Sequence, residues 1–209
     1  MFKKKYICIF LSIIVLGVVL IGLNKSTLID KFDRKYLIIQ DELILKDKHY
    51  IKLVENLSAT ELGKQIGVTD QGHQVFEIKG QDSNDWICVR DDNVEFIYRN
   101  RDIPFLTIER FKTDKIIVKN ETISGGERKT IIEQNAIDKI LADLTDKNLS
   151  NQPESIDMSK KVNLYSEAFP GLCFTLYYFH DNKSNTCFLY DYSTEDIWVI
   201  GGELLKQLL

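Results

Sequence analysis

The chain has 209 residues, of which 44% are hydrophobic, 11% aromatic and 28% charged. This composition excludes a wholly disordered chain and a collagen-like or low-complexity sequence. The 27 Lys and Arg residues against 31 Asp and Glu residues leave a net charge of −4, so no strong basic field exists to attract nucleic acid. The length allows one domain or two small ones.

An uncharged apolar segment near the N-terminus is the most prominent local feature. Residues 6–23 are rich in Ile, Leu and Val and follow a basic flank at residues 1–5. As a helix this segment would span roughly 27 Å, near the lower limit for a bilayer core. It ends without an Ala-x-Ala cleavage site or a lipid-attachment cysteine. The pattern predicts an uncleaved transmembrane signal anchor rather than a removed signal peptide or a buried core helix.

The lysines around this segment predict its orientation. Three lysines lie in the N-terminal flank, which places the N-terminus inside. Residues 24–35 then form a polar tether, and the rest of the chain lies outside the cytoplasm. The prediction is a single-pass cell-membrane protein with an extracytoplasmic C-terminal domain. Because further basic residues follow the segment, an inverted topology with a cytoplasm-facing domain stays open.

Short β-branched and aromatic runs dominate residues 36–111 and predict a β-rich subdomain. The runs lie at residues 36–39, 42–45, 50–54, 75–80, 86–90 and 94–99. Residues 91–93 predict a tight turn that joins the last two runs as a hairpin. Ser58 and Glu61 have the spacing of a capping box, which predicts a short helix that ends at Gly67.

Residues 112–209 predict an α+β subdomain. The apolar residues Ile137, Ile140, Leu141 and Leu144 fall on one face of an amphipathic helix near residues 131–146. Strands are expected at residues 116–119, 174–179, 187–192 and 196–200.

The elements together predict an α+β fold class. An N-terminal transmembrane helix precedes an antiparallel β-rich ectodomain with two or three short helices. The polar residues 146–160 are expected to form a loop, and the leucines near the C-terminus, after residue 202, predict a final short helix.

No catalytic or metal-binding pattern is visible. His49, His73 and His180 have no second His or Cys at the spacing of a zinc site. Nucleophile-elbow, phosphate-loop and dinucleotide-binding patterns do not occur. The acidic segments 181–185 and 191–196 lack the full set of calcium ligands and are better explained as turns. The sequence therefore predicts no catalytic, cofactor-binding or metal-binding residue and does not favour an enzyme.

Three cysteines, Cys88, Cys173 and Cys187, lie in predicted strands. Their odd number argues against a disulfide framework, and so does a turn register that keeps Cys173 away from Cys187. We expect all three to be small buried residues.

An aromatic cluster near the C-terminus is the main surface candidate. Strands alternate their faces, so some of these rings must point away from the core. The rings predicted to form an interaction surface for a protein or envelope partner belong to Tyr177, Phe179, Tyr190, Tyr192 and Trp198. The alternative is that they pack as core and cross-strand pairs within the sheet.

The segments at residues 62–67, 75–82 and 86–89 together resemble a module found in one class of bacterial proteins. Over about residues 41–100 the chain resembles small membrane-anchored or lipoprotein-like envelope proteins of Gram-positive bacteria. The resemblance implies an envelope setting and no catalytic residue. The missing lipid-attachment cysteine departs from the lipoprotein members and favours an anchor.

Three functions are therefore carried forward. The first is a membrane-anchored extracytoplasmic binding or interaction module that is not catalytic and attaches to the membrane through residues 6–23. The second is a cell-envelope enzyme, which a pocket with converging acids would favour. The third is a cytoplasm-facing accessory domain, which requires the inverted topology.

Overall fold

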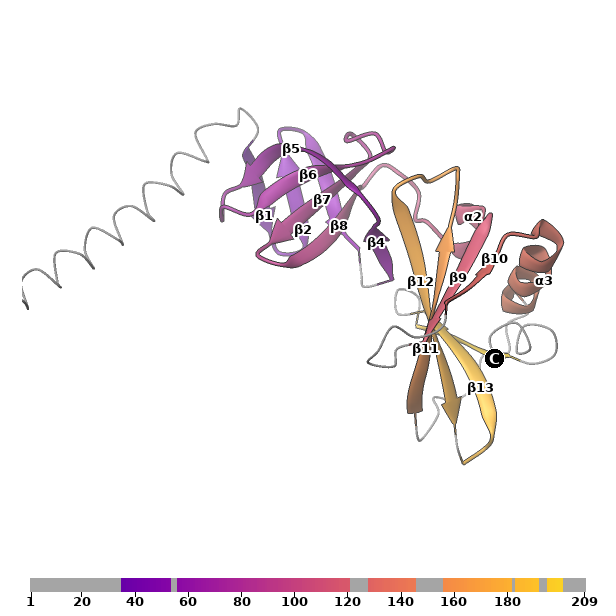
Figure 1. Ribbon diagram of the computed structural model, residues 1–209. Coiled ribbons are helices and arrows are strands. Elements are labelled where there is room, and N and C mark those ends of the chain that lie inside the picture. The colour runs from indigo at the N-terminus through magenta and orange to yellow at the C-terminus, as the bar shows by residue number, and fades with distance from the viewer. Residues whose placement is uncertain are drawn as a thin grey trace, which may run out of the picture.

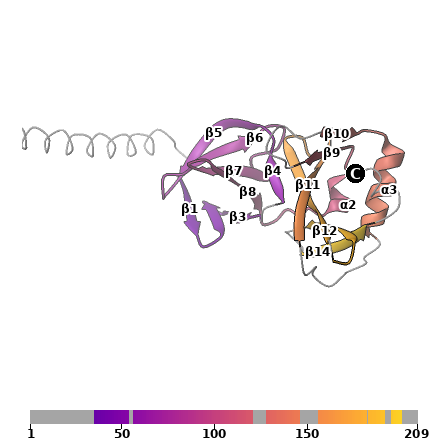
Figure 2. The same cartoon turned by 60° about the horizontal axis from the view of Figure 1, so that its bottom comes forward.

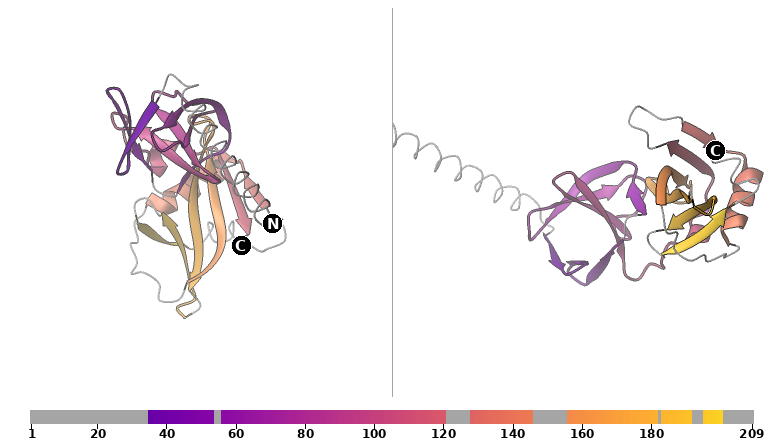
Figure 3. Two further views of the ribbon diagram at one scale, coloured as in Figure 1. Left: turned by 90° about the vertical axis from the view of Figure 1, so that its left-hand side faces the viewer. Right: turned by 90° about the horizontal axis from the view of Figure 1, so that it is seen from below.

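The computed structural model describes residues 35–53, 56–120, 128–145, 156–181, 183–191 and 195–200 (Figure 1). These residues form a closed barrel and a second, open sheet that carries two helices. The right panel of Figure 3 looks into the barrel. In Figure 2 the second sheet lies between the barrel and helix α3, Gln134–Thr145.

The barrel contains seven strands in the order β1-β2-β3-β8-β7-β6-β5. Neighbouring strands are antiparallel except β1 and β5, which pair in parallel and close the ring. The strands are β1 (Lys35–Ile39), β2 (Glu42–Leu45), β3 (Lys48–Lys52), β5 (Leu62–Thr69), β6 (Gln74–Ile78), β7 (Trp86–Asp91) and β8 (Val94–Asn100).

Alternating residues of these strands point inward and fill the barrel. The buried rings of Tyr36 and Tyr50 meet edge to face there, with their centroids 6.4 Å apart. In β7, Ile87 belongs to this interior core, whereas Cys88 points to a core shared with the second sheet. Burial on both faces explains why residues 86–89 form an uninterrupted apolar run.

The second sheet has the order β10-β9-β11-β12-β13-β14, and the short strand β4 also pairs with β12. One edge of β12 is paired with β11 along its length, whereas the other edge holds β4 in its first part and β13 in its second. The strands are β4 (Leu57–Ala59), β9 (Lys115–Asn120), β10 (Arg128–Ile131), β11 (Ile156–Tyr165), β12 (Leu172–Asp181), β13 (Thr186–Asp191) and β14 (Asp196–Ile200).

Helix α3 covers the core face of this sheet. It lies inside the range 131–146 in which the sequence predicts an amphipathic helix, and Ile137, Ile140 and Leu144 are buried against the sheet. It begins one residue after Glu133, whose backbone carbonyl accepts hydrogen bonds from the backbone N–H of residues 136 and 137 at 3.0 Å. The shorter helix α2 (Ile108–Phe111) lies between the barrel and β9 in the chain, and it is capped by Thr107.

The barrel and the second sheet meet closely at Gly171. The backbone of Gly171 has φ +81°, and a Cβ placed there would overlap the carbonyl oxygen of Lys79 in the turn after β6. The carbonyl of Gly171 also accepts a hydrogen bond of 2.8 Å from the backbone N–H of Thr60. Glycine is required at this position because any side chain would push the two parts apart.

The predicted α+β fold class is corrected, because the structure is mainly β. Within the described residues, fourteen strands accompany only two helices, and α2 is four residues long. The helix predicted from Ser58 to Gly67 is replaced by β4 and β5, because pairing with β12 and β6 outweighs a local capping pattern. Part of the loop predicted at residues 146–160 is instead the beginning of β11, which pairs with β9 and β12.

The predicted transmembrane helix and single-pass cell-membrane localisation are corrected as well. Among the residues that the structure describes, no helix is both long and apolar enough to cross a membrane. The predicted span at residues 6–23, the flank at residues 1–5 and the C-terminal helix after residue 202 lie outside the described residues. The membrane anchor, its N-inside orientation and the extracytoplasmic localisation are therefore withdrawn.

A charged cluster at the barrel surface predicts a pH dependence of stability. Glu42 contacts His49 across β2 and β3 at 3.2 Å and also binds Arg101, and these partners lower the pKa of its carboxyl group. Because the pKa is lower in the folded state, this carboxylate stabilises the protein above pH about 4.5 and loses that effect as the pH falls through the folded pKa.

We expect Glu42→Gln to weaken the fall in stability over this acidic range. Urea unfolding midpoints measured between neutral pH and pH about 3 would show the change. His49→Gln should reproduce part of the effect, because the His49 hydrogen bond is the largest cause of the shift. Identical acid profiles for Glu42→Gln and the wild type would contradict the assignment.

Candidate functional site

A cavity of about 120 Å³ lies where the barrel meets the second sheet. Most of its walls are apolar, and one arginine, one lysine and one asparagine provide the polar side chains among the described lining residues. The residues that line it are Ile51, Lys52, Leu53, Asn56, Leu57, Arg99, Phe105, Leu106 and Phe174.

Asn56 holds the strands on the sheet side of the cavity together. Its backbone carbonyl accepts a 2.6 Å hydrogen bond from the backbone N–H of Thr175 in β12. Its side-chain Nδ2 donates a 2.6 Å hydrogen bond to Oδ1 of Asp191 at the end of β13, and both side chains are buried. Asn56 therefore lies beside β12 at the point where pairing with β4 gives way to pairing with β13. It fixes one wall of the cavity.

Arg99 contributes the cation on the barrel side. It lies on β8, opposite Trp86 of β7 and Ile51 of β3. The alternation of β8 places it on the same face as Ile97, which belongs to the core shared with the second sheet. Only 7% of the Arg99 surface is exposed. Burial lowers the pKa of its guanidinium, but an arginine pKa is high enough for the group to stay charged at neutral pH.

The guanidinium of Arg99 is only partly satisfied by the described residues. Nη1 donates a 3.3 Å hydrogen bond to the backbone carbonyl of Asn100. The buried Nε has no hydrogen-bond partner within the described part of the chain. A guanidinium has five N–H donors, and a buried charge without partners is costly. The Nε–H of Arg99 can therefore donate to an acceptor that the described residues do not supply.

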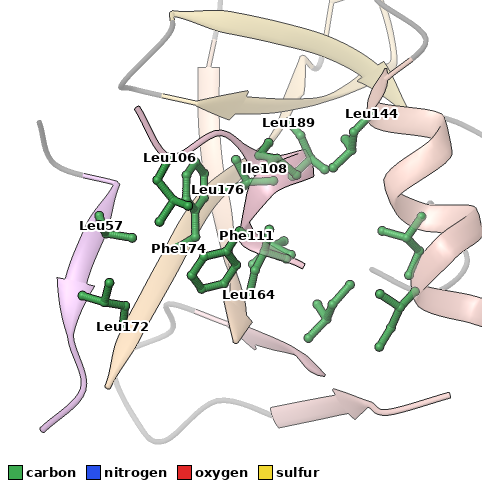
Figure 4. Packing of buried hydrophobic residues seen from close by; sticks show 14 of the residues in the cluster. Leu57, Leu106, Ile108, Phe111, Leu144, Leu164, Leu172, Phe174, Leu176 and Leu189 are labelled. Carbon is green, nitrogen blue, oxygen red and sulfur yellow. The ribbon is translucent and has the colours of Figure 1, made fainter. Parts of the chain in front are cut away.

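Leucine and phenylalanine side chains form the remaining walls. Figure 4 shows Leu57 pointing from β4 toward Phe174 of β12, with Leu106 beside them. Phe105 is 40% exposed, an unusual exposure for a large apolar ring, and it places an aromatic group where the lining reaches solvent. The arrangement can hold a small molecule with an apolar body and a group that accepts hydrogen bonds from Arg99.

The structure divides the predicted aromatic surface. Tyr177 and Tyr190 lie opposite each other on β12 and β13 and are half-buried. Phe179 is buried and lies 6.2 Å from the Tyr190 ring, whereas Trp198 belongs to the core on the other face. Tyr192 lies outside the described residues. An interaction surface at Tyr177 and Tyr190 stays a prediction.

The cysteines of the described chain are free and buried. Burial raises the pKa of the Cys88 thiol to about 12, and it also raises the pKa of Cys173. Cys187 contacts the hydroxyl of Tyr178 at 3.1 Å inside the core. Because a nucleophilic cysteine needs a lowered pKa and access to solvent, Cys88 and Cys173 do not have the properties of catalytic residues.

The acidic segments behave as turns. The carboxylate of Asp181 accepts hydrogen bonds from the backbone N–H of Lys183 at 2.9 Å and from Oγ of Ser184 at 2.8 Å, and these bonds lower its pKa. No three His, Cys, Asp or Glu residues in the described ranges come together to hold a metal ion.

A second hollow of about 570 Å³ lies beside the first residues of β12. Its lining carries both signs of charge, including Asp114, Lys115 and Glu167. Asp114 accepts a hydrogen bond from the backbone N–H of Glu167, and Nζ of Lys115 lies 4.7 Å from the centroid of the Tyr165 ring. Asp114 and Lys115 already have contacts within the fold, which makes this hollow a weaker candidate than the Arg99 cavity.

The sequence interpretation did not identify Arg99 or Asn56 as site residues. The hairpin register could have placed Arg99 opposite Trp86, and the β8 alternation could have put it on the face of Ile97. An arginine on a face with apolar neighbours was the available signal.

No protein-family model matches the chain, and no curated protein or solved structure is significantly similar to it.

Proposed function

We propose that the chain is a non-catalytic binding module whose ligand occupies the cavity between the barrel and the second sheet. One observation carries the proposal: Arg99 is buried beside an apolar cavity, and its buried Nε has no hydrogen-bond partner within the described part of the chain. A structural arginine in such a place is normally paired, because an unpaired buried charge destabilises the fold. A ligand that supplies the missing acceptor explains why the arginine is tolerated there.

The composition of the walls supports binding rather than catalysis. Among the described lining residues none is a Ser, Cys, His, Asp or Glu, and the one amine, Lys52, has its ammonium over the Phe96 ring. At about 120 Å³ the cavity is slightly smaller than the roughly 150 Å³ apolar cavity that accepts benzene, so it holds an apolar group of at most about that size.

A benzene titration tests whether the cavity accepts a ligand. We expect backbone amide resonances of residues around the cavity, including Leu57 and Phe174, to shift with a Kd of about 1 mM or lower. Leu53→Phe should abolish these shifts by filling the space. Leu45→Phe is the matched control, because Leu45 is also partly buried but packs against the barrel interior.

Retention of binding in Leu45→Phe together with its loss in Leu53→Phe would support the cavity as the ligand site. Benzene shifts that are absent up to about 10 mM, or that survive Leu53→Phe, would overturn the proposal.

A further inference from the structure

We infer that the ligand of this cavity is a small monocarboxylate with an apolar body, such as a short aliphatic or an aromatic acid. The inference rests on the proposed function, because it names the chemistry of the ligand at the same site. It follows from the charge, the geometry and the wall composition of the cavity.

The positive charge in the cavity lining favours a ligand that carries one negative charge. Arg99 and Lys52 are the two basic residues in its lining, and no acidic residue occurs among the described lining residues. Nζ of Lys52 lies 3.7 Å above the centroid of the Phe96 ring, so this ammonium already has a partner in the barrel. Arg99 is therefore the lining cation whose donor lacks a partner among the described residues, and its one guanidinium matches a monoanion.

The geometry of a guanidinium favours a carboxylate over other anions. Its planar arrangement of N–H groups matches the two oxygens of a carboxylate, which can accept two parallel hydrogen bonds. A phosphate dianion needs several donors or cations to compensate for its desolvation, and the described lining presents one free guanidinium. A hydrated inorganic anion would also leave the apolar walls without a partner.

The walls define the rest of the ligand. Leu53, Leu57, Leu106 and Phe174 present hydrocarbon surface to the same cavity as Arg99. Burial of an apolar body against these side chains is favourable, whereas a hydroxylated or second charged group would lose its hydration without compensation. The exposed ring of Phe105 adds an apolar contact where the ligand would enter.

The test compares benzoate with benzamide, its neutral analogue of the same shape. Titrations followed by the Arg99 Nε–H resonance and by backbone amide shifts should give a Kd for benzoate about 10- to 100-fold lower than for benzamide. In Arg99→Met this preference should disappear, while benzene still binds. In Arg101→Met, the matched control with an exposed arginine at Glu42, the preference should persist.

The outcomes separate this inference from the proposed function. Equal affinities for benzoate and benzamide in the wild type would overturn the carboxylate assignment and leave the cavity as a ligand site. Loss of binding of all three probes would overturn both. Because the wild-type comparison is decisive by itself, a failure of Arg99→Met to fold does not remove the test, and Arg99→Lys then provides a second variant that keeps the charge.

Two further arms identify the source of the carboxylate. A tripeptide that ends in leucine should bind more weakly than 4-methylpentanoate, because the cavity volume suits a small free acid. The reverse order would assign the site to a peptide C-terminus and overturn the small-acid assignment.

Glu55 lies outside the described residues, between Leu53 and Asn56 in the sequence. Benzoate affinity should be unchanged in Glu55→Gln; a tenfold gain would mean that this side chain competes for Arg99 and would overturn an external ligand.

Discussion

Gly171→Ala is expected to lower the free energy of unfolding by about 4 kcal/mol or more. The added Cβ would overlap the carbonyl oxygen of Lys79 and would also lie 3.2 Å from Cγ2 of Ile78. Neither obstacle is the end of a flexible side chain, so the backbone after β6 must move away from the start of β12. Alanine at φ +81° adds backbone strain of about 1 kcal/mol.

Gly72→Ala provides the matched control for this substitution. Gly72 has φ +89°, but no atom lies within 4 Å of the position where its Cβ would be. We expect a loss of about 1 kcal/mol there, from backbone strain alone. Thermal unfolding should therefore show a fall in Tm of about 2–4 °C for Gly72→Ala and several times that for Gly171→Ala. Equal losses in the two variants would show that the contact with Lys79 contributes nothing.

Arg99→Met is expected to raise the stability of the ligand-free protein by about 1–3 kcal/mol. The substitution removes a buried guanidinium whose Nε has no hydrogen-bond partner within the described residues, while the methionine keeps much of the side-chain volume. Most buried substitutions destabilise a protein, so a gain at this position would be unusual. It would indicate a residue that is kept for binding at the expense of stability.

Thermal unfolding with and without benzoate checks this result. Benzoate at 100 times its Kd should stabilise the wild type by about 2.7 kcal/mol, and it should have little effect on Arg99→Met. Arg101→Met, which removes an exposed arginine paired with Glu42, should show a small loss of stability instead of a gain. A large loss in Arg99→Met would mean that the arginine supports the fold, contrary to the proposed role.

Much of the strand content could be predicted because its signals are local. The hairpin of β7 and β8 combines β-branched and aromatic runs with a turn in which Asp92 adopts φ +50°. Strands β12, β13 and β14 have the same kind of aromatic and β-branched runs. Helix α3 is recognisable from the spacing of its apolar residues, which does not depend on the rest of the chain.

Other elements depend on partners that are distant in the sequence. Strand β11 contains polar residues such as Lys160 and Lys161, and its sequence resembles a loop. It is a strand because β9 and β12 pair with its two edges, and the ammonium groups of these lysines lie over the rings of Tyr178 and Tyr177. No local pattern announces pairing of this kind.

The candidate site was harder to predict than the strands for the same reason. The place of Arg99 on one face of β8 can be derived from alternation, but the cavity beside it exists only because another sheet packs there. Asn56 acquires its role from Asp191, which is 135 residues later in the sequence. Local sequence patterns can identify Arg99 as an unusual arginine. They do not identify the strands of the second sheet that form another wall of the cavity.

The division of one edge of β12 between β4 and β13 has a consequence for the order of events during synthesis. Strand β4 leaves the ribosome with the barrel strands, long before β12 exists to pair with it. Until then its backbone N–H and C=O groups are an open template for other chains. Because Phe174 of β12 forms one wall, the complete cavity beside Arg99 can form only after β12 has been made and has paired with β4.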